Sequence, residues 1–248
     1  MSSETYYNDR WQDENTRPFA PNEKRIQHII DAVRHYANKP GVRFTSCLEV
    51  GCGNGWILKR ISESFADLAV YGIEPSSVGA QNAQKRVPKA TIDCATLEST
   101  SIDGKFDVVI CSEILEHVAD QQSFIQKLAD RLTKKGLLVL TMPNGLFRSK
   151  YFTIHELDPQ PIENWLTGDA LRHLMDNCFS DIRIGSFDLS FWRKIHPRIN
   201  KLRQATMHVR GGWRFVRMID DLFLLPRLRG LYLITTAKKV DFNRRWHR

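Results

Sequence analysis

The sequence predicts an α/β fold: a Rossmann-like, doubly wound sheet of seven mostly parallel strands with the last strand antiparallel. Short apolar runs alternate with segments whose apolar residues recur at helical spacing. Several of the runs are apolar without interruption, which is typical of parallel strands covered by helices on both faces. A glycine cluster at residues 51–55 follows the first run, where a strand would turn into a helix.

The predicted elements follow in order along the chain. Residues 22–39 form a helix, because their apolar positions recur every three to four residues and Pro40 and Gly41 end the pattern. We predict further helices at 56–65 and 78–87, one from Phe124 that ends near Gly136, and one that Thr167 caps. The predicted strands are 46–50, 70–73, 90–95, 106–111, 137–142, 182–187 and 231–237.

The pattern also predicts how the chain is divided. Residues 1–45 would form an N-terminal helical arm or lid, residues 46–188 with 231–239 the core, and residues 189–230 a basic, aromatic insert before the last strand. The insert holds ten Lys and Arg against two Asp, and therefore accounts for the whole net charge of +8. Such a segment should face an anionic partner.

Composition excludes several classes of protein. The first residues lack the basic and apolar build of a secretory signal, and no run approaches the ~20 apolar residues of a spanning helix. The five cysteines form no C-x-x-C pair. We therefore expect a cytoplasmic protein, with peripheral contact to the inner face of the membrane through residues 189–230 as a further hypothesis.

The glycine loop reads Glu49-Val50-Gly51-Cys52-Gly53-Asn54-Gly55. Glycines at a strand-to-helix turn let the backbone approach a ligand closely. A dinucleotide site usually reads G-x-G-x-x-G, but here the third glycine comes one position early, which argues against NAD. The acidic Glu49 would repel a pyrophosphate and attract an amino group. Glu74 ends the second strand, where a carboxylate can accept hydrogen bonds from ribose hydroxyls.

These motifs resemble a known family. LEVGCGNG, YGIEPS, FDVVICSEILEHV and KKGLLVLTMPN match, in order and spacing, the motifs of class I S-adenosylmethionine-dependent methyltransferases over about residues 45–188. The resemblance implies an enzyme whose cofactor is S-adenosyl-L-methionine. It implies that the glycine loop packs on the methionine part, that Glu74 binds the ribose, and that residues 94–97 contact adenine. The implied cofactor-binding residues are Glu49, Gly51, Cys52, Gly53, Gly55, Glu74, Pro75, Thr96, Leu97 and Ser112.

The end of the fourth strand carries the candidate catalytic residues, Glu113 and His117. Methyl transfer needs an aligned acceptor and the removal of a proton, and histidine exchanges protons near neutral pH. The alternative is that His117 only braces the following helix. No metal is assigned to this site.

The closest resemblance of SEILEHV is to ubiquinone-pathway O-methyltransferases and to enzymes that methylate sugars of bacterial surface glycans. We expect O-methylation of a hydroxyl on a sugar, glycolipid or other lipid-linked small acceptor, as in polysaccharide biosynthesis. A quinone-pathway O-methyltransferase is the alternative. Tyr6, Tyr7, Arg10 and Trp11 are candidate lid residues over that acceptor, or only packing residues.

Other functions stay open. Glu113, Glu116 and His117 match the metal-binding run of small-RNA 2′-O-methyltransferases, for which His155 would supply a further ligand. A non-catalytic S-adenosylmethionine-binding protein would keep the same loop. For residues 189–230, an anionic membrane is the first hypothesis, with nucleic acid and a plain solvated surface as the alternatives. The oligomeric state is not predicted.

Overall fold

The structure is a computed structural model, and it describes Asn8, Trp11 and residues 20–148, 162–188 and 230–240. Its strands are β1 (Ser46–Val50), β2 (Ala69–Ile73), β3 (Thr91–Asp93), β4 (Phe106–Ser112), β5 (Leu132–Pro143), β6 (Phe179–Phe187) and β7 (Tyr232–Lys239). Its α-helices are α2 (Ala20–Ala37), α3 (Trp56–Ser64), α4 (Ser77–Arg86), α5 (Gln121–Asp130) and α7 (Gly168–Met175). Two short 3-10 helices, η1 (Leu115–His117) and η2 (Gly145–Phe147), follow β4 and β5.

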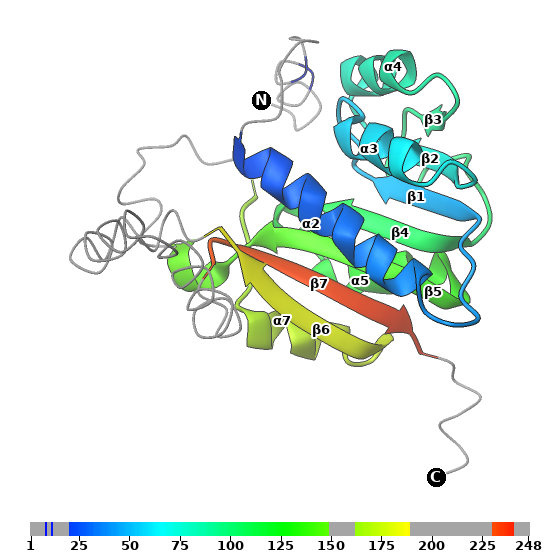
Figure 1. The fold of residues 1–248 in the computed structure, drawn as a ribbon. Coiled ribbons are helices and arrows are strands. Elements are labelled where there is room, and N and C mark those ends of the chain that lie inside the picture. The colour runs from blue at the N-terminus through cyan, green and yellow to red at the C-terminus, as the bar shows by residue number, and fades with distance from the viewer. Residues whose placement is uncertain (1–7, 9–10, 12–19, 149–161, 189–229, 241–248) are drawn as a thin grey trace, which may run out of the picture.

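The strands form one sheet in the order β3-β2-β1-β4-β5-β7-β6 (Figure 1). The neighbours from β3 to β5 pair in parallel, whereas β7 is antiparallel to both β5 and β6. The predicted seven-stranded, doubly wound sheet with an antiparallel last strand is therefore confirmed. The chain reverses its direction across the sheet between β1 and β4, and ligands bind at such a switch point, beyond the carboxyl ends of the strands.

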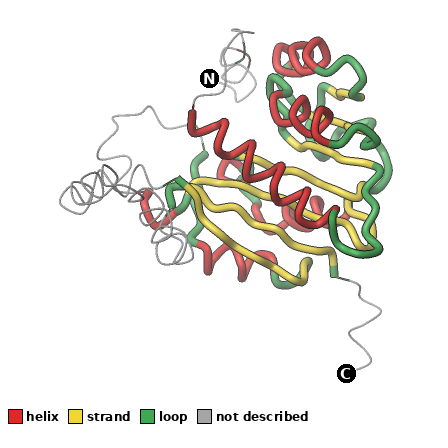
Figure 2. The backbone as a smooth tube through the Cα atoms, viewed as in Figure 1, coloured by secondary structure: helices red, strands yellow, loops and turns green. Residues whose placement is uncertain are grey.

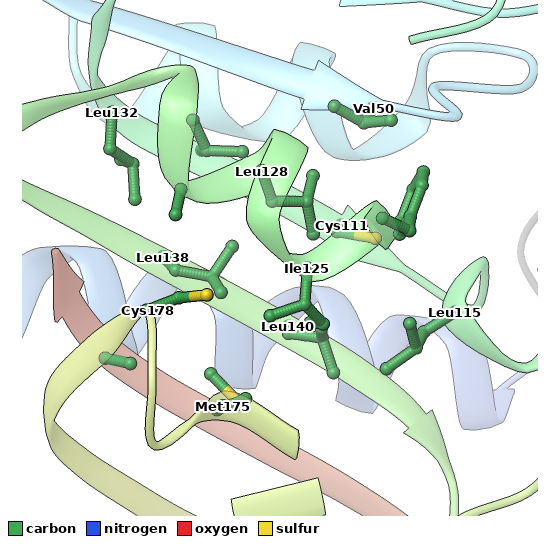
Figure 3. Packing of buried hydrophobic residues seen from close by; sticks show 14 of the residues in the cluster. Val50, Cys111, Leu115, Ile125, Leu128, Leu132, Leu138, Leu140, Met175 and Cys178 are labelled. Atoms are coloured by element: carbon green, nitrogen blue, oxygen red, sulfur yellow. The ribbon is translucent and has the colours of Figure 1, made fainter. Parts of the chain in front are cut away.

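Helices cover both faces of the sheet (Figure 2). On one face, α2, α3 and α4 bury residues such as Ile29, Leu58 and Ala83 against alternate strand positions. On the other face, α5 and α7 bury residues such as Ile125 and Met175. Figure 3 shows this second cluster between the helices and the central strands. The strands read as continuous apolar runs because both of their faces are buried.

Helix α2 belongs to the core layer. Its residues Ile29 and Val33 are completely buried and pack in the same cluster as Leu58 of α3. This helix falls within the predicted N-terminal arm of residues 1–45, and it covers one face of the sheet (Figure 1). Of the residues before α2, only Asn8 and Trp11 are described, so the lid role predicted for residues 1–45 stays a prediction.

Several predicted boundaries differ from the structure; for example, β6 begins at Phe179, three residues before the predicted start. The helix that was expected to end near Gly136 ends at Asp130, and β5 begins already at Leu132, which pairs with Phe106 of β4. The edge strand β3 spans Thr91–Asp93 rather than residues 90–95. Tertiary pairing decides these boundaries, because local propensity is a weak guide at the ends of elements. The predicted cap is confirmed: the Thr167 hydroxyl accepts a hydrogen bond from the N–H of Ala170.

Several predictions fall on residues that the structure does not describe. They concern the insert, of which only Gly230 is described, the lid candidates Tyr6, Tyr7 and Arg10, and the metal-ligand candidate His155. Within the described ranges, no helix combines the length and apolar character that crossing a membrane requires. The division into arm, core and insert stays a prediction.

Candidate active site

The glycine loop connects β1 to α3 in left-handed backbone conformations. Gly51 and Gly53 have φ angles of 73° and 50°. The N–H groups of Gly51 and Cys52 both donate to the carbonyl of Ile73, at 2.8 and 3.0 Å, so the loop is fastened to the end of β2. A Cβ at Gly51 would lie 2.3 Å from Cδ1 of Ile114. Glycine is therefore required here by both the backbone angle and the close approach.

Glu74 lies at the end of β2 and is 4% exposed. Its two carboxylate oxygens accept hydrogen bonds from the N–H groups of Gly53, at 2.8 Å, and Ser76, at 3.0 Å. Burial raises the pKa of Glu74, while these two hydrogen bonds oppose the increase. The carboxylate thus joins the glycine loop to the start of α4, at the point where the sequence places the ribose.

Glu49 is the penultimate residue of β1, close enough to Glu74 for their charges to interact, and is 1% exposed. Burial raises its pKa well above the ordinary value; a hydrogen bond from the backbone of Leu58 lowers it, and the charge of Glu74 adds to the increase. Within the described part of the chain, its Oε2 has no hydrogen-bond partner. A cationic group beside this oxygen would favour the ionised carboxylate.

The predicted adenine contacts lie on the segment after β3. The thiol of Cys94 approaches the carbonyl of Pro75 at 3.9 Å, which links this segment to the end of β2. Thr96 is exposed, and its N–H donates to the hydroxyl of Ser99 at 3.1 Å. Leu97 is 5% exposed and packs in the hydrophobic core. The role of these residues toward adenine stays a prediction.

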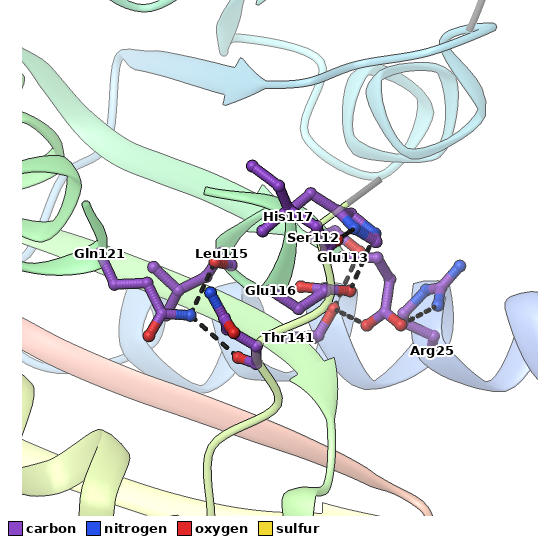
Figure 4. A network of polar contacts seen from close by, with 10 residues as sticks. Arg25, Ser112, Glu113, Leu115, Glu116, His117, Gln121 and Thr141 are labelled. Atoms are coloured by element: carbon purple, nitrogen blue, oxygen red, sulfur yellow. Dashed lines mark hydrogen bonds and ion pairs between the residues drawn. The ribbon is translucent and has the colours of Figure 1, made fainter. Parts of the chain in front are cut away.

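The end of β4 holds a chain of polar contacts that includes both predicted catalytic residues (Figure 4). Glu113 accepts a hydrogen bond from Thr141 Oγ1 at 3.0 Å and forms an ion pair with Arg25 of α2 at 3.1 Å. Ser112 Oγ lies 2.8 Å from Thr141 Oγ1. Glu113 has a φ angle of 57°, an uncommon conformation outside glycine, which is often found at functional sites.

His117 is held at the end of η1. Its Nδ1 lies 2.8 Å from the carbonyl oxygen of Ile162, and its Nε2 lies 3.7 Å from Oε1 of Glu116. A carbonyl oxygen can only accept, so Nδ1 carries a proton. In the neutral ring Nε2 is then the basic nitrogen. The side chain is 14% exposed.

Glu116 is a buried acid between His117 and Glu113 and is 1% exposed. Burial raises its pKa well above the ordinary value, and the charge of Glu113 adds to the increase. Its Oε2 has no hydrogen-bond partner among the residues that the structure describes. Within the same residues, no group of three or more His, Cys, Asp or Glu is placed to hold a metal ion.

This buried acid predicts a dependence of stability on pH. In the unfolded chain Glu116 ionises near the ordinary value of 4.5, whereas the folded chain keeps its proton to higher pH. The folded state therefore binds more protons, and the free energy of unfolding falls as pH rises from the ordinary value through the raised pKa. Glu116→Gln does not titrate and should become more stable relative to wild type by about 1–3 kcal/mol across this window.

Urea unfolding of both proteins from about pH 5 to about pH 8 measures this difference. Glu63→Gln is the matched control, because the Glu63 carboxylate is exposed on α3. A Glu116→Gln difference that is the same at every pH would contradict the raised pKa.

The comparisons with known proteins agree with this geometry. A family model described as "Methyltransferase domain" matches residues 11–178, which is more than half of the chain. The chain belongs to this methyltransferase family. The ordered motifs of the sequence therefore identified the family correctly.

Curated relatives of this methyltransferase are named ubiquinone biosynthesis O-methyltransferases. That of Rickettsia prowazekii is 31% identical over 142 residues, which cover 54% of this chain and 53% of the relative. That of Bradyrhizobium diazoefficiens is 29% identical over 178 residues, which cover 63% and 68%. The match thus spans about half of the first relative's length.

Solved structures share the fold of this methyltransferase. A magnesium protoporphyrin IX methyltransferase from Synechocystis, with bound S-adenosylhomocysteine, has a TM-score of 0.60 at 20% identity and covers 96% of this chain and 97% of its own. An N-methyltransferase from Bradyrhizobium japonicum has a TM-score of 0.61 at 10% identity, with 95% and 97% covered.

Sequence reasoning missed one residue of the candidate site, Arg25. It lies four residues before Ile29 and eight before Val33, so helical spacing places it on the buried stripe of α2. A cation on an apolar stripe indicates a buried anionic partner, and this was the available signal. The partner, Glu113, is far away in the sequence and could not be named from it.

Proposed function

We propose that this methyltransferase transfers a methyl group from S-adenosylmethionine to the oxygen of a ring hydroxyl on a precursor of a quinone. Methyl transfer follows from the family, and the names of the curated relatives support the quinone acceptor. Those names favour the quinone alternative over the sugar or glycolipid acceptor that was the first expectation from the sequence. The observation that carries the proposal is the pair of buried carboxylates, Glu49 and Glu74, beside a glycine loop in this family.

The chain's own residues fit the cofactor. Glu74 would accept hydrogen bonds from the ribose hydroxyls with its remaining lone pairs, since each oxygen already accepts one from the backbone. Glu49 would pair with the ammonium group, which supplies the partner that its buried oxygen lacks. The glycine loop leaves room for the methionine part. When bound, S-adenosylmethionine supplies a methyl group on a positively charged sulfur, which needs no further activation.

The proton of the acceptor would leave through His117. Its Nδ1 donates to the carbonyl of Ile162, so the ring is held in one orientation with Nε2 as the basic nitrogen. Oε1 of Glu116 lies 3.7 Å from Nε2, so the imidazolium that forms on proton transfer would favour ionisation of this buried acid. A hydroxyl of an aromatic ring is a better match for such a base than a sugar hydroxyl, because a phenol is the stronger acid.

Glu113 and Arg25 would shape the acceptor side of the site. Their ion pair joins the end of β4 to α2, and the Arg25 guanidinium also lies 5.7 Å from the centre of the Tyr232 ring. Tyr232 stacks on Phe187 with a centroid distance of 5.3 Å. Aromatic rings beside the carboxyl ends of the central strands favour an aromatic acceptor over a sugar.

An acceptor assay tests this proposal. The protein should methylate a hydroquinone-type ubiquinone precursor in the presence of S-adenosylmethionine, with formation of S-adenosylhomocysteine and a mass gain of one CH₂ in the acceptor. Glu74→Ala is the control, because it should bind the cofactor more weakly and methylate the acceptor more slowly at low cofactor concentration. Methylation of glycans or glycolipids, with none of the aromatic acceptor, would contradict the quinone assignment and restore the sugar hypothesis.

A further inference from the structure

Trp11 lies against the predicted ribose end of the cofactor site. A Cβ at Gly53 of the glycine loop would lie 2.8 Å from its Cζ2 atom, and a Cβ at Gly79 of α4 would lie 3.0 Å from its Cδ1 atom. The same Gly79 position is 3.0 Å from Cγ of Glu74. The indole therefore spans from the glycine loop to α4 beside Glu74, and glycine on both walls leaves room for the ring.

Hydrogen bonds hold the backbone carbonyl of Trp11 and the side chain of Asn8 in this place. The carbonyl of Trp11 accepts from Asn82 Nδ2 at 2.9 Å, and the same nitrogen donates to Asn54 Oδ1 of the glycine loop at 3.1 Å. Asn8 accepts from the hydroxyl of Ser76 at 2.7 Å. That hydroxyl also caps α4.

The hydrogen bonds of Asn8 and Trp11 connect to the residues that bind the Glu74 carboxylate. Ser76 and Gly53 are the residues whose N–H groups bind the Glu74 carboxylate. Asn54 and Asn82 are 3% and 4% exposed, so the amide bridge between the loop and α4 is shielded from water. A hydrogen bond away from water is stronger, and a carboxylate held on both sides keeps a fixed direction.

We propose that Trp11 is a cofactor-binding residue: its indole covers the ribose of S-adenosylmethionine beside Glu74, excludes water there and slows release of the cofactor. This inference rests on the proposed function. It differs from the hypothesis made from the sequence, in which Trp11 was a candidate lid residue over the acceptor or only a packing residue. An aromatic ring suits this task, because it covers a large area and loses little conformational freedom.

Calorimetry with S-adenosylhomocysteine tests the proposal on the full chain. Trp11→Ala should bind about tenfold more weakly than wild type, because S-adenosylhomocysteine is released faster. Trp11→Phe should keep most of the affinity. Wild type should show a change of tryptophan fluorescence on binding, and Trp11→Phe should lose it. Trp56→Phe is the matched control, because its ring contacts Arg86 and Lys59 and should leave both readouts unchanged.

The outcomes separate the two proposals. Equal affinity of Trp11→Ala and wild type would make Trp11 a packing residue only, while the proposed function would stand. Tighter binding by Trp11→Ala would show that the indole occupies the place of the cofactor, which also overturns the inference. Absence of binding to wild type would overturn the proposed function itself. Circular dichroism of the cofactor-free variants shows that they are folded.

Discussion

Replacing His117 by alanine should lower the rate of methyl transfer by about 10²–10⁴-fold, the usual contribution of a positioned general base. Cofactor affinity should stay unchanged, because His117 contacts the Ile162 carbonyl and Glu116 rather than the glycine loop. Steady-state kinetics with the acceptor substrate measure the rate of methyl transfer, and calorimetry with S-adenosylhomocysteine measures the cofactor affinity.

The control for this variant is His173→Ala. His173 is an exposed histidine on α7. It should show wild-type kinetics. Unchanged turnover in His117→Ala would mean that the histidine only braces the segment around Ile162. Loss of activity on chelation, restored by Mn²⁺ or Mg²⁺, would instead favour the metal-dependent RNA 2′-O-methyltransferase hypothesis.

Replacing Glu74 by alanine should weaken binding of S-adenosylmethionine by about 1.5–3 kcal/mol, the range for hydrogen bonds to a charged group. This corresponds to a roughly 10- to 150-fold higher Kd. The effect has two sources, since the carboxylate would bind the ribose and also holds the N–H groups of Gly53 and Ser76. Calorimetry gives the affinity, and thermal unfolding without cofactor gives the contribution of the loop.

Glu63→Ala is the matched control, because Glu63 is an exposed carboxylate near the end of α3 that pairs with Lys59 at 3.7 Å. Its affinity for the cofactor should equal that of wild type. Binding of NADH in place of S-adenosylmethionine would contradict the assignment of Glu74 and of the whole site.

The elements and the cofactor edge could be predicted from the sequence because their signals are local. A buried parallel strand is an uninterrupted apolar run, and β1 spans the predicted residues 46–50. The turn after it needs left-handed angles, so the glycines of residues 51–55 marked it without any knowledge of the tertiary structure. The proximity of Glu49 and Glu74 could also be predicted, because the ends of adjacent parallel strands lie at the same edge of the sheet.

Contacts between distant segments had to wait for the tertiary structure. The ion pair of Arg25 with Glu113 and the packing of Trp11 beside Glu74 join residues from separate parts of the sequence. The raised pKa of Glu116 depends on burial and on the charge of Glu113, and both depend on how η1 packs. Local sequence therefore determined the strands, the glycine loop and the acids that end the strands. Packing decided which of these side chains are buried from water, which are ionised and which are in contact. Burial and electrostatics act through space rather than along the chain.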